Sequence, residues 1–177
     1  AGNSLVCTLP STGNYQDLVY VANLGIQLPH LKDSNTIIMA NFTSEPRQGE
    51  EEVGKPFFEA MGYEVHNCPF KWEGEADLKY LYDNVYIGGY GIRSDIKAYE
   101  WMEKEFDMKI IKLEMVDDYL YHLDCSIFPL TQEKTLVCTE MFEEDELAQL
   151  EQHTEIIDIS VDDAFNGLTN SVRLGNM

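Results

Sequence analysis

The feature of this sequence that most restricts its fold is a pattern of two strands, a helix and a further strand that occurs three times. The units begin near residues 17, 73 and 121, and a period of about 50 residues is typical of propellers and other repeat folds. One such unit cannot bury its own apolar face, so each unit must pack against its neighbours. At 177 residues the chain has room for one domain with a sizeable core, and we expect residues 1–177 to form it.

The bounds of the expected elements follow from the spacing of apolar residues and from the turn residues between them. The first unit predicts strands at 17–28, 36–41 and 64–69 with a helix at 48–61. The second predicts strands at 72–81, 85–89 and 109–114, with a helix that is capped by Ser94 and ends near residue 106. The third predicts strands at 119–130, 135–139 and 155–159 with a helix at 143–152. A short helix capped by Ser160 and a strand at 170–177 complete the chain.

A histidine and a carboxylate stand two residues apart in the third unit, in the stretch Tyr121-His122-Leu123-Asp124. Residues two apart in a strand share a face, so His122 and Asp124 should point the same way and Cys125 the opposite way. An imidazole beside a carboxylate can transfer protons near neutral pH. The alternative is a pair of polar strand residues whose hydrogen bonds are satisfied locally.

The second unit carries Glu73, Glu75 and Asp77 at alternate positions, which a regular strand would place on one face. Three carboxylates this close repel one another unless they bind a cation. A metal ion is not favoured, because no pair of histidines has the spacing of metal ligands, and we expect no cofactor. An exposed or bulged strand is the alternative. If the units are arranged radially, equivalent strand positions converge on one axis, and Asp17 and Asn23 are the first unit's polar residues there.

Arginines precede two of the helices. Arg93 follows the run Gly88-Gly89-Tyr90-Gly91, whose glycines we expect to form a tight turn from strand to helix. Arg47 stands before the first helix in a comparable place. Arginine is suited to bidentate binding of a carboxylate, and surface ion pairs are the alternative.

The balance of charge limits the partners of this chain. Its formal net charge is −20, which argues against nucleic acids and anionic membranes, because both are bound through basic patches. No apolar run approaches the ~18 residues of a membrane helix. The cysteines have no metal-type spacing and are expected to be reduced thiols of a cytoplasmic protein: Cys7, Cys68, Cys125 and Cys138. The other histidines are expected at the surface: His30, His66 and His153.

Six stretches together resemble the guanidine-modifying superfamily of the penteins, in particular its dimethylarginine dimethylaminohydrolase-like and amidinotransferase-like members. They follow the order of the family along nearly the whole chain: Asp17-Leu-Val-Tyr-Val-Ala-Asn23-Leu-Gly25, Arg47 with Glu50, Trp72-Glu-Gly-Glu-Ala-Asp77, Gly89-Tyr-Gly-Ile-Arg93-Ser, Tyr121-His-Leu-Asp124 and Asn170-Ser-Val-Arg-Leu-Gly175. The resemblance implies an α/β propeller of five ββαβ-type units around a polar channel. This chain would hold about three full units and lack part of the first and last.

The resemblance also implies roles for particular residues. His122 would be the general acid/base, and Glu73, or alternatively Glu75, would orient the guanidinium and the histidine. The substrate-binding residues would be Asp124, Arg93, Asn23, Asp17 and Arg47. A cysteine thiolate would attack the central carbon of the guanidinium while the histidine passes a proton to the departing amine.

Two departures from the family pattern bear on the function. The family's cysteine nucleophile would lie beyond residue 177, so we expect this chain alone to be inactive. Asn23 stands where many of the hydrolases have an aspartate, which allows a substrate other than arginine itself. The prediction is an enzyme that hydrolyses C–N bonds of arginine-like or methylarginine-like substrates. An amidinotransferase, a non-catalytic binding module and a structural propeller remain alternatives, and a homo-oligomer is possible.

Overall fold

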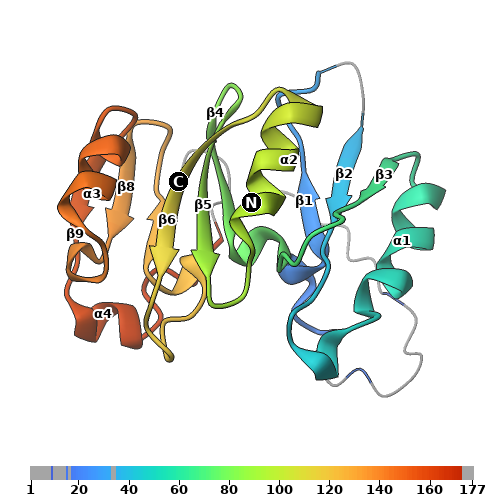
Figure 1. Ribbon diagram of the computed structural model, residues 1–177, viewed down its shortest axis with the longest axis horizontal. Helices are drawn as coiled ribbons and strands as arrows, with labels where there is room; N and C mark the ends of the chain where they lie inside the picture. Colours follow the sequence, from blue (N-terminus) through green and yellow to red (C-terminus); the bar gives the residue numbers. More distant parts are fainter. Residues whose placement is uncertain (1–8, 10–14, 16, 33–34, 173–177) are drawn as a thin grey trace, which may run out of the picture.

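The computed structural model describes residues 9, 15, 17–32 and 35–172 of the chain. Its strands form three small sheets that follow one another across the molecule in chain order (Figure 1). The first sheet contains β1 (Gly25–Gln27), β2 (Thr36–Met39) and β3 (Glu64–Asn67); the second contains β4 (Leu78–Tyr82), β5 (Val85–Gly91) and β6 (Lys109–Met115); the third contains β7 (Ile127–Pro129), β8 (Lys134–Val137) and β9 (Glu155–Asp158). In each sheet the first two strands pair antiparallel and the last two pair parallel. The predicted ββαβ unit is therefore present three times.

One helix crosses between the parallel strands of each unit: α1 (Glu50–Ala60), α2 (Ile96–Phe106) and α3 (Glu144–Glu151). Asp95, rather than the predicted Ser94, caps α2, because the Asp95 side chain accepts the Lys97 amide. The final helix, α4 (Val161–Phe165), starts at Ser160, whose hydroxyl accepts the Asp163 amide as predicted. None of the described helices has the length and apolar composition that crossing a membrane would require.

The predicted strands 17–28, 72–81 and 119–130 are wrong in their first halves. Each unit enters its first strand through a short 3-10 turn: η1 (Val21–Leu24), η3 (Gly74–Ala76) and η4 (Leu123–Cys125). Two further turns, η2 (Glu45–Arg47) and η5 (Thr139–Met141), lie before α1 and α3. Alternation of side chains between two faces therefore does not apply where the polar motifs lie. The strand expected at 170–177 is not formed at residues 170–172, and the remainder lies outside the described residues.

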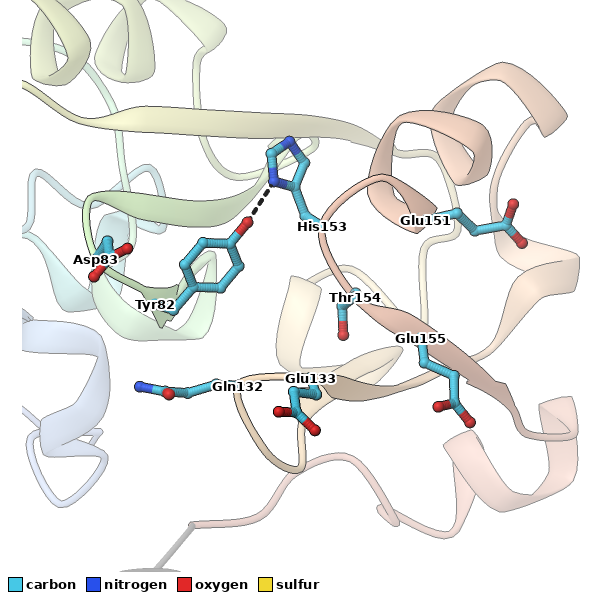
Figure 2. Close-up of a pocket in the computed structure, with 8 residues that line it drawn as sticks. All are labelled: Tyr82, Asp83, Gln132, Glu133, Glu151, His153, Thr154 and Glu155. Carbon is cyan, nitrogen blue, oxygen red and sulfur yellow. Dashed lines mark hydrogen bonds between the residues drawn. The ribbon is translucent and has the colours of Figure 1, made fainter.

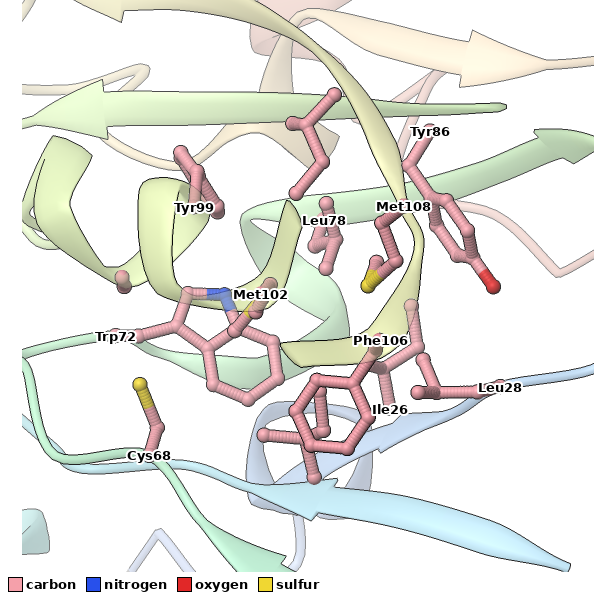
Figure 3. Packing of buried hydrophobic residues seen from close by; sticks show 13 residues of the cluster. Ile26, Leu28, Cys68, Trp72, Leu78, Tyr86, Tyr99, Met102, Phe106 and Met108 are labelled. Atoms are coloured by element: carbon pink, nitrogen blue, oxygen red, sulfur yellow. The ribbon is translucent and has the colours of Figure 1, made fainter. Parts of the chain in front are cut away.

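The largest apolar cluster joins the first two units (Figure 3). Trp72 and Tyr99 are fully buried in it, and Ile26 of β1 and Leu28, which directly follows β1, belong to the same cluster. A second cluster joins the second and third sheets, with Leu81, Ile87 and Leu113 on one side and Leu123 and Val137 on the other. Apolar burial thus lies between neighbouring units, as expected for units that cannot form a core alone.

Glycines of β5 let the third unit approach the second. A Cβ atom at Gly89 would lie 2.9 Å from the Leu123 Cβ, so a larger residue there would push η4 away. The Tyr99 hydroxyl donates to the carbonyls of Asp77 (2.8 Å) and Gly89 (2.6 Å), which ties α2 to the same place. The prediction that this glycine run forms a turn is wrong for Gly88 and Gly89, which lie inside β5. Gly91 is the last residue of β5, and it alone of the three has a positive φ, of 118°.

Candidate functional site

The candidate site lies where the 3-10 turns of the second and third units meet. Glu73 is the residue immediately before η3, and His122 is the residue immediately before η4. The two turns are equivalent, because β4 begins at Leu78 directly after Asp77 and β7 begins at Ile127 directly after Ser126. In both units this first residue pairs with the residue ten positions later, Leu78 with Gly88 and Ile127 with Val137. The repeat of the fold therefore brings Glu73 and His122 together from positions far apart in sequence.

His122 is held by Asp77 at one ring nitrogen. The Nδ1 atom lies 2.9 Å from Asp77 Oδ1, and both side chains are buried. An ionised carboxylate can only accept, so Nδ1 carries the proton that is donated to Asp77. The Leu123 amide donates to the same oxygen at 3.2 Å. The tautomer and the orientation of the imidazole are therefore set by Asp77, which leaves Nε2 free to gain and lose a proton.

The Nε2 atom of His122 faces Glu73, with 3.4 Å between Nε2 and Oε2. Burial alone would lower the pKa of His122, because it disfavours the imidazolium. The hydrogen bond to Asp77, together with the charges of Asp77 and Glu73, outweighs burial, so the pKa is raised above its ordinary value. A histidine in this environment is suited to hold a proton near neutral pH and to release it to a leaving group.

Glu73 is fully buried, and its two oxygens have different partners. Oε1 accepts the amides of Thr43 and Ser44, each at 3.1 Å, so the first unit fixes its position. Oε2 faces both His122 and Arg93, whose guanidinium nitrogen lies 3.4 Å away. One carboxylate oxygen thus connects the histidine to the arginine.

Asp77 was predicted only as one of three carboxylates that bind a cation, and Ser94 only as a helix cap; neither was assigned a role at His122. The Ser94 hydroxyl donates to Asp77 Oδ2 at 2.6 Å and accepts the backbone amide of Glu73 at 3.1 Å, so it links the Asp77 carboxylate to the main chain of Glu73. Ser94 is available for this because Asp95 caps α2. Asp77 stands four residues after Glu73, at the other end of the turn η3. An expected turn in place of a strand would have indicated that Glu73 and Asp77 lie close together.

Asp124 and Glu75 lie beside this cluster, in a hollow of about 320 Å³ that Ala22 and Lys79 also line. The Lys79 ammonium is 4.0 Å from Asp124 Oδ2, and Cys125 Sγ is 3.8 Å from Asp124 Oδ1. Burial raises the pKa of Asp124, although the charge of Lys79 opposes it. The expected common face of Glu73, Glu75 and Asp77 is wrong, since Glu75 is exposed while the other two are buried. The prediction that Cys125 points away from Asp124 is also wrong.

The structure places Arg47 in a buried ion pair rather than at the rim of the site. Its guanidinium lies 2.7 Å from a Glu50 oxygen, packs over the Phe42 ring and donates to the carbonyls of Asp17 (3.3 Å) and Tyr20 (3.4 Å). Asp17 thus contacts Arg47 through its backbone carbonyl.

The predicted substrate-binding residue Asn23 is buried. Its backbone carbonyl lies so close to Gly74 that a Cβ atom there would come within 2.3 Å of the oxygen.

A second hollow, of about 520 Å³, lies away from His122, beside the β4–β5 turn and the start of β9 (Figure 2). His153 lies there with its Nδ1 atom 2.8 Å from the Tyr82 hydroxyl. His30 likewise bonds to Tyr86 and to the Phe106 carbonyl, both at 2.8 Å. These two histidines were expected at the surface; they are half-buried and hydrogen-bonded.

Among the residues that the structure describes, no group of three His, Cys, Asp or Glu side chains could hold a metal ion.

Comparison with known proteins shows what this chain is similar to. Residues 5–177 match the model of the family described as N,N dimethylarginine dimethylhydrolase, eukaryotic. The bifunctional arginine dihydrolase/ornithine cyclodeaminase AgrE of Nostoc sp. is 32% identical over 119 residues, which are 66% of this chain and 16% of that protein. The N(G),N(G)-dimethylarginine dimethylaminohydrolase of Mycobacterium tuberculosis is 29% identical over 126 residues, which are 71% of this chain and 39% of that protein.

Among solved structures, a mutant of AgrE in complex with L-arginine superimposes with a TM-score of 0.87 at 28% identity, covering 97% of this chain and 26% of that chain. Another, DDAH from Pseudomonas aeruginosa complexed with citrulline, has a TM-score of 0.69 at 16% identity and covers 86% of this chain and 57% of that chain; this match concerns the fold alone. The predicted α/β fold of the pentein type is confirmed. The chain spans less than two thirds of the length of each of these relatives.

Proposed function

Because the chain belongs to the family of the N,N-dimethylarginine dimethylhydrolases, we propose that it carries the acid/base and substrate-binding part of an enzyme that hydrolyses a C–N bond of a guanidino group. The observation that carries the proposal is the buried His122 between two carboxylates, with Asp77 at Nδ1 (2.9 Å) and Glu73 at Nε2 (3.4 Å). The carboxylates supply negative charge for a planar guanidinium, and the imidazole can give a proton to the amine that leaves it.

In the proposed reaction, a cysteine thiolate outside the described residues attacks the central carbon of the guanidinium. The C–N bond to the departing amine breaks, and His122 gives its Nε2 proton to that amine, so a covalent thiouronium remains. Water then attacks the same carbon, His122 takes a proton from it, and the thiol is released with a ureido product. Asp77 keeps its hydrogen bond to Nδ1 throughout. General acid/base catalysis by such a group contributes about 10²–10⁴-fold in rate.

The substrate-binding residues that we propose are Glu73, Asp124 and Arg93. Glu73 and Asp124 supply negative charge for the guanidinium, and Arg93 supplies donors for a substrate carboxylate. Arg93 is preferred to Arg47 for this role because Glu50 already occupies the Arg47 guanidinium. Glu75 is left as a rim residue, since it is exposed.

An amidinotransferase differs from this proposal only in the group that attacks the thiouronium, which would be an amine instead of water. A binding module without catalysis is the other candidate, and one observation favours it for residues 1–177. Burial, followed by the charge of Asp124, raises the pKa of the Cys125 thiol to about 11, so this thiol, which lies beside Asp124, is not a nucleophile at neutral pH.

We also propose that the protein acts in the cytoplasm on a small guanidino compound. The free thiols of Cys68, Cys125 and Cys138 fit a reducing compartment. The net charge of −20 fits a cationic substrate and no nucleic acid.

Calorimetric titration of the 177-residue chain with L-arginine, dimethylarginine and agmatine tests the proposal. We expect the ligands with a carboxylate to bind more tightly than agmatine. We expect no citrulline or urea-type product, because none of the cysteines that the structure describes has a lowered pKa. Asp124→Asn should weaken all three ligands by roughly 10- to 150-fold, the equivalent of an ion-paired hydrogen bond of about 1.5–3 kcal/mol. Arg93→Ala should weaken only the ligands that carry a carboxylate.

Asp118→Asn is the matched control for Asp124→Asn, because Asp118 is an exposed carboxylate of the same unit. If the two variants bind L-arginine equally, Asp124 has no role in the site. If citrulline accumulates and a thiol reagent stops it, the assignment of the nucleophile to another part of the protein is wrong.

A further inference from the structure

Tyr121 contacts two of the proposed functional groups at once. The Arg93 guanidinium carbon lies 4.4 Å from the centre of the Tyr121 ring, which is the geometry of a cation–π contact. The centres of the Tyr121 and His122 rings are 4.7 Å apart, with an angle of 53° between the ring planes. A single ring therefore adjoins both the arginine and the histidine of the site.

The second contact of Arg93 is weak. One guanidinium nitrogen lies 3.4 Å from Glu73 Oε2, at the long end of a hydrogen bond, and the side chain is 26% exposed. One such contact does not fix a long, flexible side chain. The Tyr121 face supplies the second restraint and leaves most of the five N–H groups of the guanidinium for another partner.

Packing alone does not account for this position. Tyr121 is half-buried and is a member of none of the four apolar clusters formed by described residues, whereas Leu120 and Leu123 on either side of it are buried members. No hydrogen bond of its hydroxyl is present within the described part of the chain. The ring of Tyr121 instead contacts Arg93 and His122, two residues of the site.

We propose that Tyr121 is a positioning residue that holds Arg93 at a set distance from His122, and that it thereby selects ligands carrying both a guanidinium and a carboxylate. The proposal rests on the proposed function of the site and adds its determinant of specificity. The electron-rich ring face attracts the guanidinium of Arg93, while the Nε2 atom of His122 and Glu73 receive the other end of the ligand. Without the ring, Arg93 can close onto Glu73 and neutralise the carboxylate that the ligand needs.

Two substitutions distinguish the ring face from the hydroxyl. Tyr121→Phe keeps the face and should leave the preference for L-arginine over agmatine unchanged in calorimetric titration of the 177-residue chain. Tyr121→Leu removes the face and should reduce that preference by about two- to fivefold, the equivalent of an exposed cation–π contact of about 0.5–1 kcal/mol. Tyr119→Leu is the matched control, because Tyr119 is 76% exposed and its ring faces Phe165 instead of the site.

A measurement without ligand keeps the test independent of the proposed function. The ring current of Tyr121 should move the Cδ protons of Arg93 to high field in the NMR spectrum, and this shift should persist in Tyr121→Phe and vanish in Tyr121→Leu. An unshifted Arg93 in the unmodified chain overturns the inference, and so does a preference for L-arginine that survives Tyr121→Leu. A shifted Arg93 in a chain that binds neither ligand supports the placement of Arg93 by Tyr121 and refutes the proposed function instead.

Discussion

Replacing Asp77 by asparagine should destabilise the protein in a way that depends on pH. Asp77 accepts three hydrogen bonds, from His122 Nδ1 (2.9 Å), the Leu123 amide (3.2 Å) and the Ser94 hydroxyl (2.6 Å). Asparagine has nearly the same shape and can still accept at Oδ1, so the main loss is the negative charge beside His122. A hydrogen bond to a charged group contributes about 1.5–3 kcal/mol, and we expect Asp77→Asn to lower the free energy of unfolding by about that amount at pH 6.

The direction of the pH dependence follows from the pKa of His122. Its pKa in the folded protein is raised above the ordinary value, so the imidazolium contributes stability that is fully present below the pKa of an unfolded histidine. That contribution is lost as the pH rises through the pKa of folded His122. Removing the charge of Asp77 lowers the pKa of His122 and removes part of this contribution. The difference in unfolding free energy between the two proteins should therefore be largest near pH 6 and smaller at pH 9.

Urea unfolding followed by circular dichroism at pH 6, 7.5 and 9 measures this difference, and NMR titration of His122 measures its pKa directly. Asp83→Asn is the matched control: Asp83 is an exposed carboxylate at the β4–β5 turn, and asparagine tolerates its positive φ of 44°. Equal stability of the two variants at pH 6 would refute the account of the His122–Asp77 pair. So would a difference that grows as the pH rises.

Two further results are expected. Gly74→Ala should destabilise the protein by more than the ~1 kcal/mol typical of point substitutions and by more than Gly62→Ala in urea unfolding: both glycines have positive φ (69° and 84°), but only at Gly74 would a Cβ atom meet a backbone carbonyl, at 2.3 Å. Equal losses would show that the units are not packed this closely. Cys125 should react slowly with a disulfide reagent at pH 7 and about tenfold faster for each pH unit up to pH 9, since its pKa is raised to about 11; rapid labelling at pH 7 would contradict that pKa.

The sequence was sufficient for the elements that depend on local pattern. The apolar spacing of α1 and α2, the turn residues before β2 and β5, and the Ser160 cap of α4 each predict the observed element to within a few residues. It also identified Glu73, His122 and Arg93, and in the structure His122 and Arg93 each lie 3.4 Å from Glu73 Oε2. These residues stand out because polar groups in otherwise apolar stretches are costly unless they are paired.

Alternation along a strand failed at the same stretches. The residues that follow Glu73 and His122 form 3-10 turns, in which the Asp77 amide donates to the Gly74 carbonyl and the Ser126 amide to the Leu123 carbonyl. In the first of these turns Gly74 takes a positive φ of 69°. The assumed alternation of strand residues therefore predicted that Glu75 shares a face with Glu73 and that Cys125 points away from Asp124. In the structure Glu75 is exposed while Glu73 is buried, and Cys125 Sγ lies 3.8 Å from Asp124 Oδ1. The local sequence offers no strong signal against a strand there, since aromatic and apolar residues surround both turns.

The repeat of the units and the identity of the charged residues were determined by the sequence by itself, because both are properties of order along the chain. Which carboxylate holds His122 was decided only by the tertiary structure. The hydrogen bond between Asp77 and His122 joins two units. It requires a glycine at position 89, where a Cβ atom would collide with Leu123. It also requires Asp95 to cap α2, so that the Ser94 hydroxyl can donate to Asp77. Each of these depends on contacts between residues that are distant in the chain, and such contacts form only when the faces of neighbouring units are buried against each other.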